Sequence, residues 1–170
     1  MAKIRMYRVQ LDYIKYLWEY IDKKVQYRKG ASDEYNIMRP YVGVVYELGD
    51  YKYFAPLEHP RLEHQRLKAN PHIVKIDGGV LGIIAIGNMI PVTDEILIKF
   101  DINAESGWYR KILIRQYIFC KNNIVNICEN ATKTYENVVN KKIEFFVKNC
   151  CDFKSLEIGL KEYLTVYRTR

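Results

Sequence analysis

The hydrophobic pattern near the start of the chain predicts a strand, a helix and a loop. Residues 6–10 are β-prone, and Asp12 then stands at the expected N-cap of a helix. The buried face of this helix is expected to consist of apolar residues at helical spacing: Ile14, Leu17, Trp18 and Ile21. A second stripe beside that face contains Tyr13, Tyr16 and Tyr20. Residues 23–37 are mostly polar and predict a loop.

Strand-forming residues dominate the middle of the chain. Residues 41–48 are rich in β-branched and aromatic side chains, and Gly49-Asp50 predicts a turn into a second strand at residues 51–55. Pro56 is expected to end this hairpin, because proline has no N–H to donate to a ladder. Residues 73–76 and 80–86 predict another hairpin, and residues 89–90 and 96–100 predict further short strands.

The second half of the chain has helical periodicity. Apolar residues recur at helical spacing over residues 109–131, with the polar Gln116 as the exception. The pair Asn122-Asn123 weakens this pattern without clearly ending it. Residues 135–148 predict another helix, and Asp152 is expected to cap the last one. Strands followed by helices, without repeats or a linker, predict a single α+β domain over residues 1–170.

Composition narrows the class of partner. The hydrophobic fraction of 49% is typical of a globular protein and argues against disorder. An excess of 27 basic over 20 acidic residues gives a net charge of +7, which favours a polyanionic partner because bound phosphates release their counterions. Fifteen tyrosines supply rings that stack on bases and hydroxyls that reach phosphate or sugar, although many are expected in the core.

Targeting and redox signals indicate a soluble cytoplasmic protein. The first seven residues lack the apolar core of a secretion signal, and the apolar stretch at residues 79–92 is too short to cross a bilayer. The four cysteines, Cys120, Cys128, Cys150 and Cys151, have no C-x-x-C spacing. We therefore expect reduced thiols and no cysteine-based zinc site.

All three histidines lie between residues 59 and 72, after a predicted strand. Cleavage of RNA without a metal needs a base for the 2′-hydroxyl, an acid for the leaving 5′-oxygen and a cation for the charged phosphorane. Within eight residues the chain offers His59, Arg61, His64 and Arg66. A solvated charged loop is the alternative explanation. A metal site that adds Glu58 and Glu63 is a further one, although the H-E-x-x-H spacing is absent.

The order of motifs along the chain resembles that of the ToxN/AbiQ endoribonuclease toxins of type III toxin–antitoxin systems. The resemblance covers nearly the whole chain and rests on these runs: MY at 6–7, DYIKYL at 12–17, DKKV at 22–25, RPYVGVVYEL at 39–48, YKYFAPL at 51–57, LG at 81–82, NMIPV at 88–92, YRKIL at 109–113 with Gln116, and CDF at 151–153 with Leu156-Glu157.

This resemblance implies a compact, twisted antiparallel sheet flanked by helices, similar to the MazF/Kid-like ribonuclease toxins. It also implies cleavage without metal or cofactor that leaves a 2′,3′-cyclic phosphate. The implied substrates are mRNA and the repeated precursor of the toxin's own antitoxin. The implied inhibitor is a small pseudoknotted RNA that joins the toxin in a closed assembly and serves phage defence. A membrane or DNA partner is not expected.

The resemblance carries over to the histidine segment with one departure. Where the family has Thr-Ser before Pro-Lys, this chain has Glu58-His59 before Pro60-Arg61, so we expect His59 to act as the general base in place of a hydroxyl. Glu58 either orients His59 or is a solvated neighbour. Arg39 and Arg61 stand where the family has phosphate-binding lysines. His64 matches a family histidine and is a candidate acid or a plain surface residue.

Further residues are expected at the RNA surface, with solvated helix faces as the competing explanation. They are Tyr13, Lys24, Glu58, Arg66, Lys68, Arg110, Lys111 and Arg115. Two other functions remain open from the residues alone. A noncatalytic RNA-binding module would use the same basic, tyrosine-rich surface, and a protein-interaction domain would carry its charge incidentally.

Overall fold

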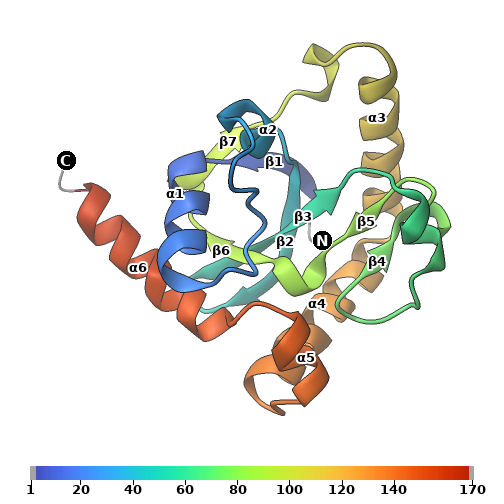
Figure 1. The fold of residues 1–170 in the computed structure, drawn as a ribbon. Helices are drawn as coiled ribbons and strands as arrows, with labels where there is room; N and C mark the ends of the chain where they lie inside the picture. Colours follow the sequence, from blue (N-terminus) through green and yellow to red (C-terminus); the bar gives the residue numbers. More distant parts are fainter. Residues whose placement is uncertain (1–2, 169–170) are drawn as a thin grey trace.

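The computed structural model describes residues 3–168, so the ends of the predicted domain, residues 1–2 and 169–170, lie outside the described residues. A seven-stranded sheet forms the centre of the fold, with the order β4-β5-β3-β2-β1-β7 and with β6 paired to β3 (Figure 1). All of its strand pairs are antiparallel. The strands are β1 Arg5–Val9, β2 Tyr41–Leu48, β3 Tyr51–Glu58, β4 Val74–Lys75, β5 Ile83–Ile84, β6 Ile90–Val92 and β7 Leu97–Lys99.

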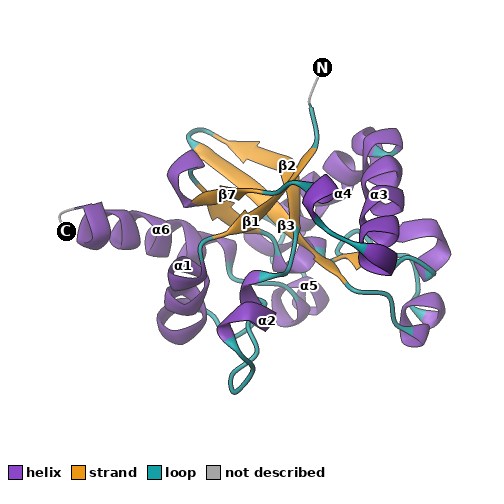
Figure 2. Ribbon diagram, turned by 90° about the horizontal axis from the view of Figure 1, so that it is seen from above, coloured by secondary structure: helices purple, strands orange, loops and turns teal. Residues whose placement is uncertain are grey.

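Helices flank this sheet, as the sequence predicted (Figure 2). They are α1 Leu11–Tyr16, α2 Asp33–Ile37, α3 Gly107–Asn122, α4 Ile124–Val139, α5 Glu144–Asn149 and α6 Phe153–Arg168. A π-helical turn, Leu17–Ile21, continues α1. The last helix, α6, lies against this turn and β6, whereas α4 packs on β2. The α+β class is therefore confirmed, and the likeness to MazF/Kid-like toxins stays a prediction.

The core is rich in aromatic rings. Its largest fully buried side chains include Tyr13, Tyr41, Tyr53 and Phe153. Buried Glu157 of α6 accepts hydrogen bonds from the hydroxyls of Tyr53 (2.8 Å) and Tyr135 (2.6 Å). Many of the tyrosines therefore stabilise the fold rather than face a ligand.

Two predictions in the first half of the chain are wrong. Asp12 lies in the first turn of α1, and Gln10 occupies the N-cap without a capping side chain. The expected loop at residues 23–37 contains α2, whose start is stabilised by a hydrogen bond from the Tyr35 amide to Ser32 Oγ (3.1 Å).

Strand β3 continues through Pro56, which the sequence predicted as its end. The Pro56 carbonyl accepts from the Ala85 amide (2.9 Å), and the Leu57 amide donates to the Pro40 carbonyl (2.9 Å). Because the ladder uses the carbonyl of Pro56 and the amide of its neighbour, the missing proline N–H breaks no pairing there. This extension brings Glu58 to the end of a central strand.

The helical half also differs in its boundaries. The pattern that Asn122-Asn123 weakened does break, because Asn123 leaves helical geometry and its side chain donates to the Phe119 carbonyl (2.8 Å). Residues 135–139 end α4 rather than begin a new helix, and α5 begins at Glu144. Asp152 caps α6 as predicted, since its Oδ1 accepts from the Ser155 amide (3.2 Å).

Predictions about thiols and membrane spans also meet structural evidence. The four cysteines are free thiols. Burial raises the pKa of Cys120 and of Cys150 to about 12. Among the described residues, no helix has both the length and the apolar character that a bilayer crossing requires.

Candidate functional site

The site forms where the end of β3 meets the start of β2. The backbone hydrogen bond from Leu57 to Pro40 joins these two strands and sets Arg39 beside the last residues of β3. After Glu58 the chain leaves the sheet as His59-Pro60-Arg61 and enters a short 3-10 helix, Leu62–Arg66. A loop set on a rigid central strand is a common position for catalytic groups.

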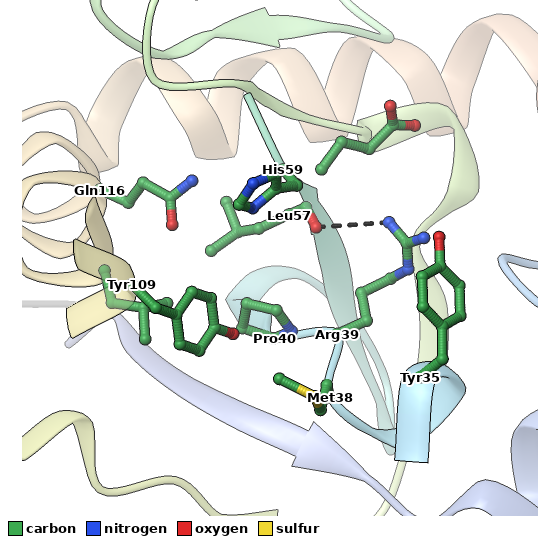
Figure 3. A pocket seen from close by; sticks show the side chains of 10 residues that line it. Tyr35, Met38, Arg39, Pro40, Leu57, His59, Tyr109 and Gln116 are labelled. Carbon is green, nitrogen blue, oxygen red and sulfur yellow. Dashed lines mark hydrogen bonds between the residues drawn. The ribbon is translucent and has the colours of Figure 1, made fainter. Parts of the chain in front are cut away.

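Two adjoining hollows open at this point and share the lining residues Tyr35, Arg39, Glu58 and His59. The first has a volume of about 250 Å³, and its other lining residues include Pro40, Tyr109 and Gln116. The second has a volume of about 610 Å³ and is also lined by Gln26, Tyr27, Arg28 and Arg61. Figure 3 shows His59 and Gln116 on one side of the first hollow, with Arg39 and Tyr35 on the other.

His59 is exposed and belongs to both hollows. Its ring lies edge-on against the exposed Trp108 at the start of α3, with ring centroids 5.6 Å apart. The ring nitrogens are therefore accessible to a ligand that enters either hollow.

Glu58 is held by three donors. Gln26 Nε2 donates to Oε1 (3.0 Å), while Arg61 Nη2 (2.6 Å) and His64 Nε2 (3.2 Å) contact Oε2. The Glu58 side chain is only 15% exposed. It is thus neither a solvated neighbour nor oriented toward His59 by a hydrogen bond, which corrects both expectations for this residue.

His64 is 1% exposed, which corrects the prediction that it is a surface residue or an acid in contact with RNA. The Arg61 amide donates to its Nδ1 (3.3 Å), so the ring proton sits on Nε2 and donates to Glu58. Arg61 Nε also lies within hydrogen-bond distance of Nε2 (3.4 Å), and it can donate there only in the tautomer in which Nε2 carries no proton. The 3-10 helix turns His64 inward behind Glu58.

The two predicted phosphate-binding arginines differ in their partners. Arg39 is half-buried and donates through Nη1 to the Leu57 carbonyl (3.4 Å), which leaves most of its N–H donors for a ligand (Figure 3). The guanidinium of Arg61 is paired with Glu58 and, through Nη1, with Glu63 (3.1 Å). A phosphate at Arg61 must therefore compete with two carboxylates.

Two of the residues predicted to bind RNA have structural roles, which overturns the prediction for the buried Tyr13 and leaves it a prediction for the exposed Lys24. Tyr13 is completely buried, and its ring lies 5.0 Å from that of Tyr163 on α6. Its hydroxyl donates to the Pro91 carbonyl. The Lys24 ammonium donates to the carbonyls of Val147 (3.2 Å) and Cys150 (2.8 Å), so it stabilises the end of α5.

Apart from Glu58, which is only 15% exposed, the remaining predicted RNA contacts lie on the surface. Arg66, Lys68, Arg110 and Lys111 are exposed. Arg115 of α3 is also exposed and lies 3.5 Å from Asp77. Their positions are compatible with RNA binding, which stays a prediction for all of them.

Sequence reasoning missed several residues of the site. Tyr35, Gln26 and Trp108 carry no spacing signal that would have placed them here. Gln116 did carry one, since a polar residue interrupts the apolar face of its helix. It is 3% exposed, donates to the Leu81 carbonyl (2.8 Å) and lines the first hollow. Burial raises the pKa of the neighbouring Tyr109, and Arg8 partly offsets this.

The alternative metal site finds no ligand set in the structure. Within residues 3–168, no three histidine, cysteine or acidic side chains gather in a way that would hold a metal ion. Glu58 and His64 do lie close together, but their partners are Gln26 and Arg61.

Known proteins share both the sequence and the fold. Over 167 residues, the chain is 30% identical to the endoribonuclease ToxN of Bacillus thuringiensis subsp. kurstaki, an alignment that covers 94% of this chain and 84% of that protein. It is 29% identical to the endoribonuclease AbiQ of Lactococcus lactis subsp. lactis, with 91% and 86% covered.

Solved structures agree with this relationship. The structure of AbiQ, a lactococcal anti-phage endoribonuclease of a type III toxin–antitoxin system, superposes with a TM-score of 0.80 at 28% identity, over 96% of this chain and 99% of that one. A type III toxin that is selectively inhibited by a non-coding RNA pseudoknot superposes with a TM-score of 0.76 at 28% identity, over 95% and 98%. The sequence profile described as toxin ToxN of type III toxin–antitoxin systems matches residues 5–161, and the chain therefore belongs to the ToxN family.

Proposed function

We propose that this member of the ToxN family is an endoribonuclease toxin that cleaves RNA without a metal ion, through attack of the 2′-hydroxyl on the adjacent phosphate. The proposal rests chiefly on one observation, the exposed His59 beside the available Arg39 in a hollow of this fold. Its sequence relatives are named endoribonucleases.

In the proposed reaction the 2′-oxygen forms a bond to phosphorus while the bond from phosphorus to the 5′-oxygen breaks. One group removes the 2′-hydroxyl proton and another protonates the 5′-oxygen, which leaves a 2′,3′-cyclic phosphate and a 5′-hydroxyl. His59 serves as one of these proton-transfer groups. Arg39 stabilises the charged phosphorane through two N–H donors, and Arg61 supports it once a phosphate displaces one of its carboxylate partners.

The proposed substrates are mRNA and the repeated precursor of the antitoxin RNA, in the cytoplasm. The proposed inhibitor is the processed, pseudoknotted antitoxin, bound with the toxin in a closed assembly that acts in phage defence. Support comes from the solved relative that an RNA pseudoknot inhibits. We propose that the RNA backbone follows the exposed cations Arg66, Lys68, Arg110, Lys111 and Arg115. The half-exposed ring of Tyr35 provides a stacking surface at the hollow.

Incubation of the purified protein with labelled RNA in EDTA tests this function. We expect the wild type to produce fragments with 2′,3′-cyclic phosphate ends, and His59→Ala to lose at least about 100-fold in rate, the contribution typical of a proton-transfer group. His72→Asn is the matched control, because His72 lies beside Phe145 and Phe146 and lines neither hollow of the site.

The possible outcomes separate the competing functions. A wild-type protein that binds RNA in EDTA without cutting it would favour the noncatalytic binding module. Cleavage that persists in His59→Ala would retain the nuclease and remove His59 from its chemistry.

A further inference from the structure

We propose that Glu58 is the general base of the reaction and His59 the general acid, with His64 as the residue that positions Glu58. This inference rests on the proposed ribonuclease function and assigns the two proton-transfer roles within it. It reverses the role expected for His59 from the sequence, where a histidine replaces a hydroxyl.

The contacts of Glu58 suit a carboxylate. Every polar side chain that contacts it is a donor: the Gln26 amide, the Arg61 guanidinium and the Nε2–H of His64. A carboxylate accepts from all three, and its negative charge pairs with the Arg61 guanidinium. In that form Glu58 can accept the proton that a base removes.

One acceptor position of Glu58 remains open. A carboxylate oxygen accepts about two hydrogen bonds. Oε2 has two donors, Arg61 at 2.6 Å and His64 at 3.2 Å, whereas Oε1 has one, Gln26 at 3.0 Å. Glu58 lines both hollows, so the free position on Oε1 is available to a 2′-hydroxyl that enters them.

His64 sets the orientation of this carboxylate. It is buried behind Glu58, and the Arg61 amide holds its ring in the tautomer that donates to Oε2. Because the carboxylate cannot rotate while Oε2 is held in this way, Oε1 stays in one orientation. A histidine fixed by a backbone amide supplies an orientation that water or a flexible surface side chain would not.

His59 has the surroundings of an acid instead. It is exposed, pairs with no carboxylate among the described residues, and lines both hollows with its ring against Trp108. Glu58 takes the 2′-hydroxyl proton as the phosphorus–2′-oxygen bond forms. The imidazolium of His59 gives its proton to the 5′-oxygen as the phosphorus–5′-oxygen bond breaks. One proton enters the protein and one leaves, so Glu58 ends protonated and His59 neutral, and exchange with water restores both.

An RNA with sulfur in place of the 5′-oxygen, at the bond that the wild type is found to cut, tests this assignment. A thiolate leaves without protonation, so the sulfur substrate does not need an acid. We expect His59→Ala to lose at least about 100-fold in rate on ordinary RNA and to recover most of it on the sulfur substrate. Glu58→Gln should lose a similar factor on both substrates. Recovery of Glu58→Gln alone, or of neither variant, would overturn the assignment.

The pH profile of the wild type provides a second criterion. If His59 is the acid, the rate falls toward high pH because the acid has lost its proton, and His59→Ala lacks that alkaline limb. If His59 is the base, the rate of the wild type has no alkaline limb that depends on His59, and the inference is wrong. Wild-type protein that cuts neither substrate would instead refute the proposed function.

Two variants at position 64 isolate positioning from folding. His64→Phe removes the donor to Glu58, and His64→Gln places an amide donor near the Nε2 position. We expect His64→Phe to slow cleavage at least about tenfold. It should also move the acidic limb of the profile to higher pH, because a carboxylate that loses a donor holds its proton to higher pH. His64→Gln should restore both properties. A loss of rate without movement of the limb would leave His64 a merely structural role.

Discussion

At the residue scale, buried tyrosine hydroxyls differ in how well they are satisfied. The Tyr13 hydroxyl donates to the Pro91 carbonyl and the Tyr53 hydroxyl to Glu157, whereas the buried Tyr41 hydroxyl has no partner among the described residues. A buried hydroxyl without a partner loses its hydration and gains nothing in return. Tyrosines that are equally buried therefore contribute different amounts to stability.

This difference predicts opposite outcomes for one chemical change. Tyr53→Phe removes a donor from buried Glu157 and should lower the free energy of unfolding by about 1.5–3 kcal/mol, the range for hydrogen bonds to charged groups. Tyr41→Phe removes an unpartnered hydroxyl and should change it by less than about 0.5 kcal/mol or raise it. Urea unfolding followed by circular dichroism measures both. Equal losses of stability in the two variants would contradict the prediction that hydrogen bonding of the hydroxyl decides the outcome.

Single residues of the site were predictable where histidine chemistry or the family resemblance identified them. His59 and Arg39 do line one hollow, as their place in the resembling motifs suggested. The burial of His64 was not predictable, because residue spacing does not say which side of a 3-10 turn faces inward. Tyr13 was misassigned for a similar reason. The Tyr13 ring packs against Tyr163 of α6, whose sequence lies at the other end of the chain.

At the scale of elements, the loop between β4 and β5 sets the end of β3. Gly82 has a φ of +92°, and a Cβ at this position would overlap the carbonyl oxygen of Glu58. Gly78 lies in the same loop with a φ of +62°, but a Cβ there would meet open space. The two glycines thus share a positive φ that would strain any other residue, and they differ in contact with the site.

Alanine substitutions at Gly78 and Gly82 separate the effect of backbone strain from the effect of displacing the end of β3. Both variants should lose about 1–2 kcal/mol of stability, because an L-residue is strained at positive φ. Gly82→Ala should lose a further 1–3 kcal/mol or so from the overlap. It should also cleave RNA at least about tenfold more slowly, because the end of β3 must shift and carry Glu58 out of alignment. Thermal unfolding gives the stabilities, and cleavage is compared at a temperature where both variants are folded. Equal cleavage rates would contradict a close coupling of this loop to the site.

Elements with strong local signals were predicted well. The hairpin of β2 and β3 has alternating β-branched and aromatic residues around Gly49-Asp50, and both strands formed. The strand end predicted at Pro56 was wrong because the effect of a missing N–H depends on the register of the strand, which only its partner strands define. The end of α3 at Asn123 was equally hidden, since a side chain that donates to its own backbone can stop a helix whose apolar period continues.

At the scale of the whole molecule, the two ends of the described chain form one core. The hydroxyl of Tyr16 donates to Glu162 (3.1 Å), and the Tyr13 and Tyr163 rings are in contact. The first and last helices therefore stabilise each other across the sheet edge. This packing supports the proposal that residues 1–170 form a single domain.

The surface, by contrast, has two distinct sides. Helix α3 stands beside the hollows on one side of the molecule, and α6 extends on the other (Figures 1 and 2). The exposed Arg110 and Lys111 lie on α3, next to the hollow-lining Tyr109. On α6, the ammonium of Lys161 lies 5.6 Å from the Tyr51 ring. Of these two helices, only α3 is expected to present cations to RNA that enters the site.

Salt dependence of RNA binding measures this asymmetry. Each phosphate contact on a single strand contributes about 0.7 to the slope of log affinity against log salt concentration, because the contact releases a condensed cation. The double variant Arg110→Gln, Lys111→Gln should therefore bind with a slope shallower by about 1.4. Lys161→Gln should keep the slope, although it also removes one positive charge.

Both variants are made in the His59→Ala background so that the RNA stays intact during titration. Equal slopes in all variants would mean that α3 does not contact the RNA backbone. A shallower slope for Lys161→Gln alone would move the RNA path to the opposite side of the molecule.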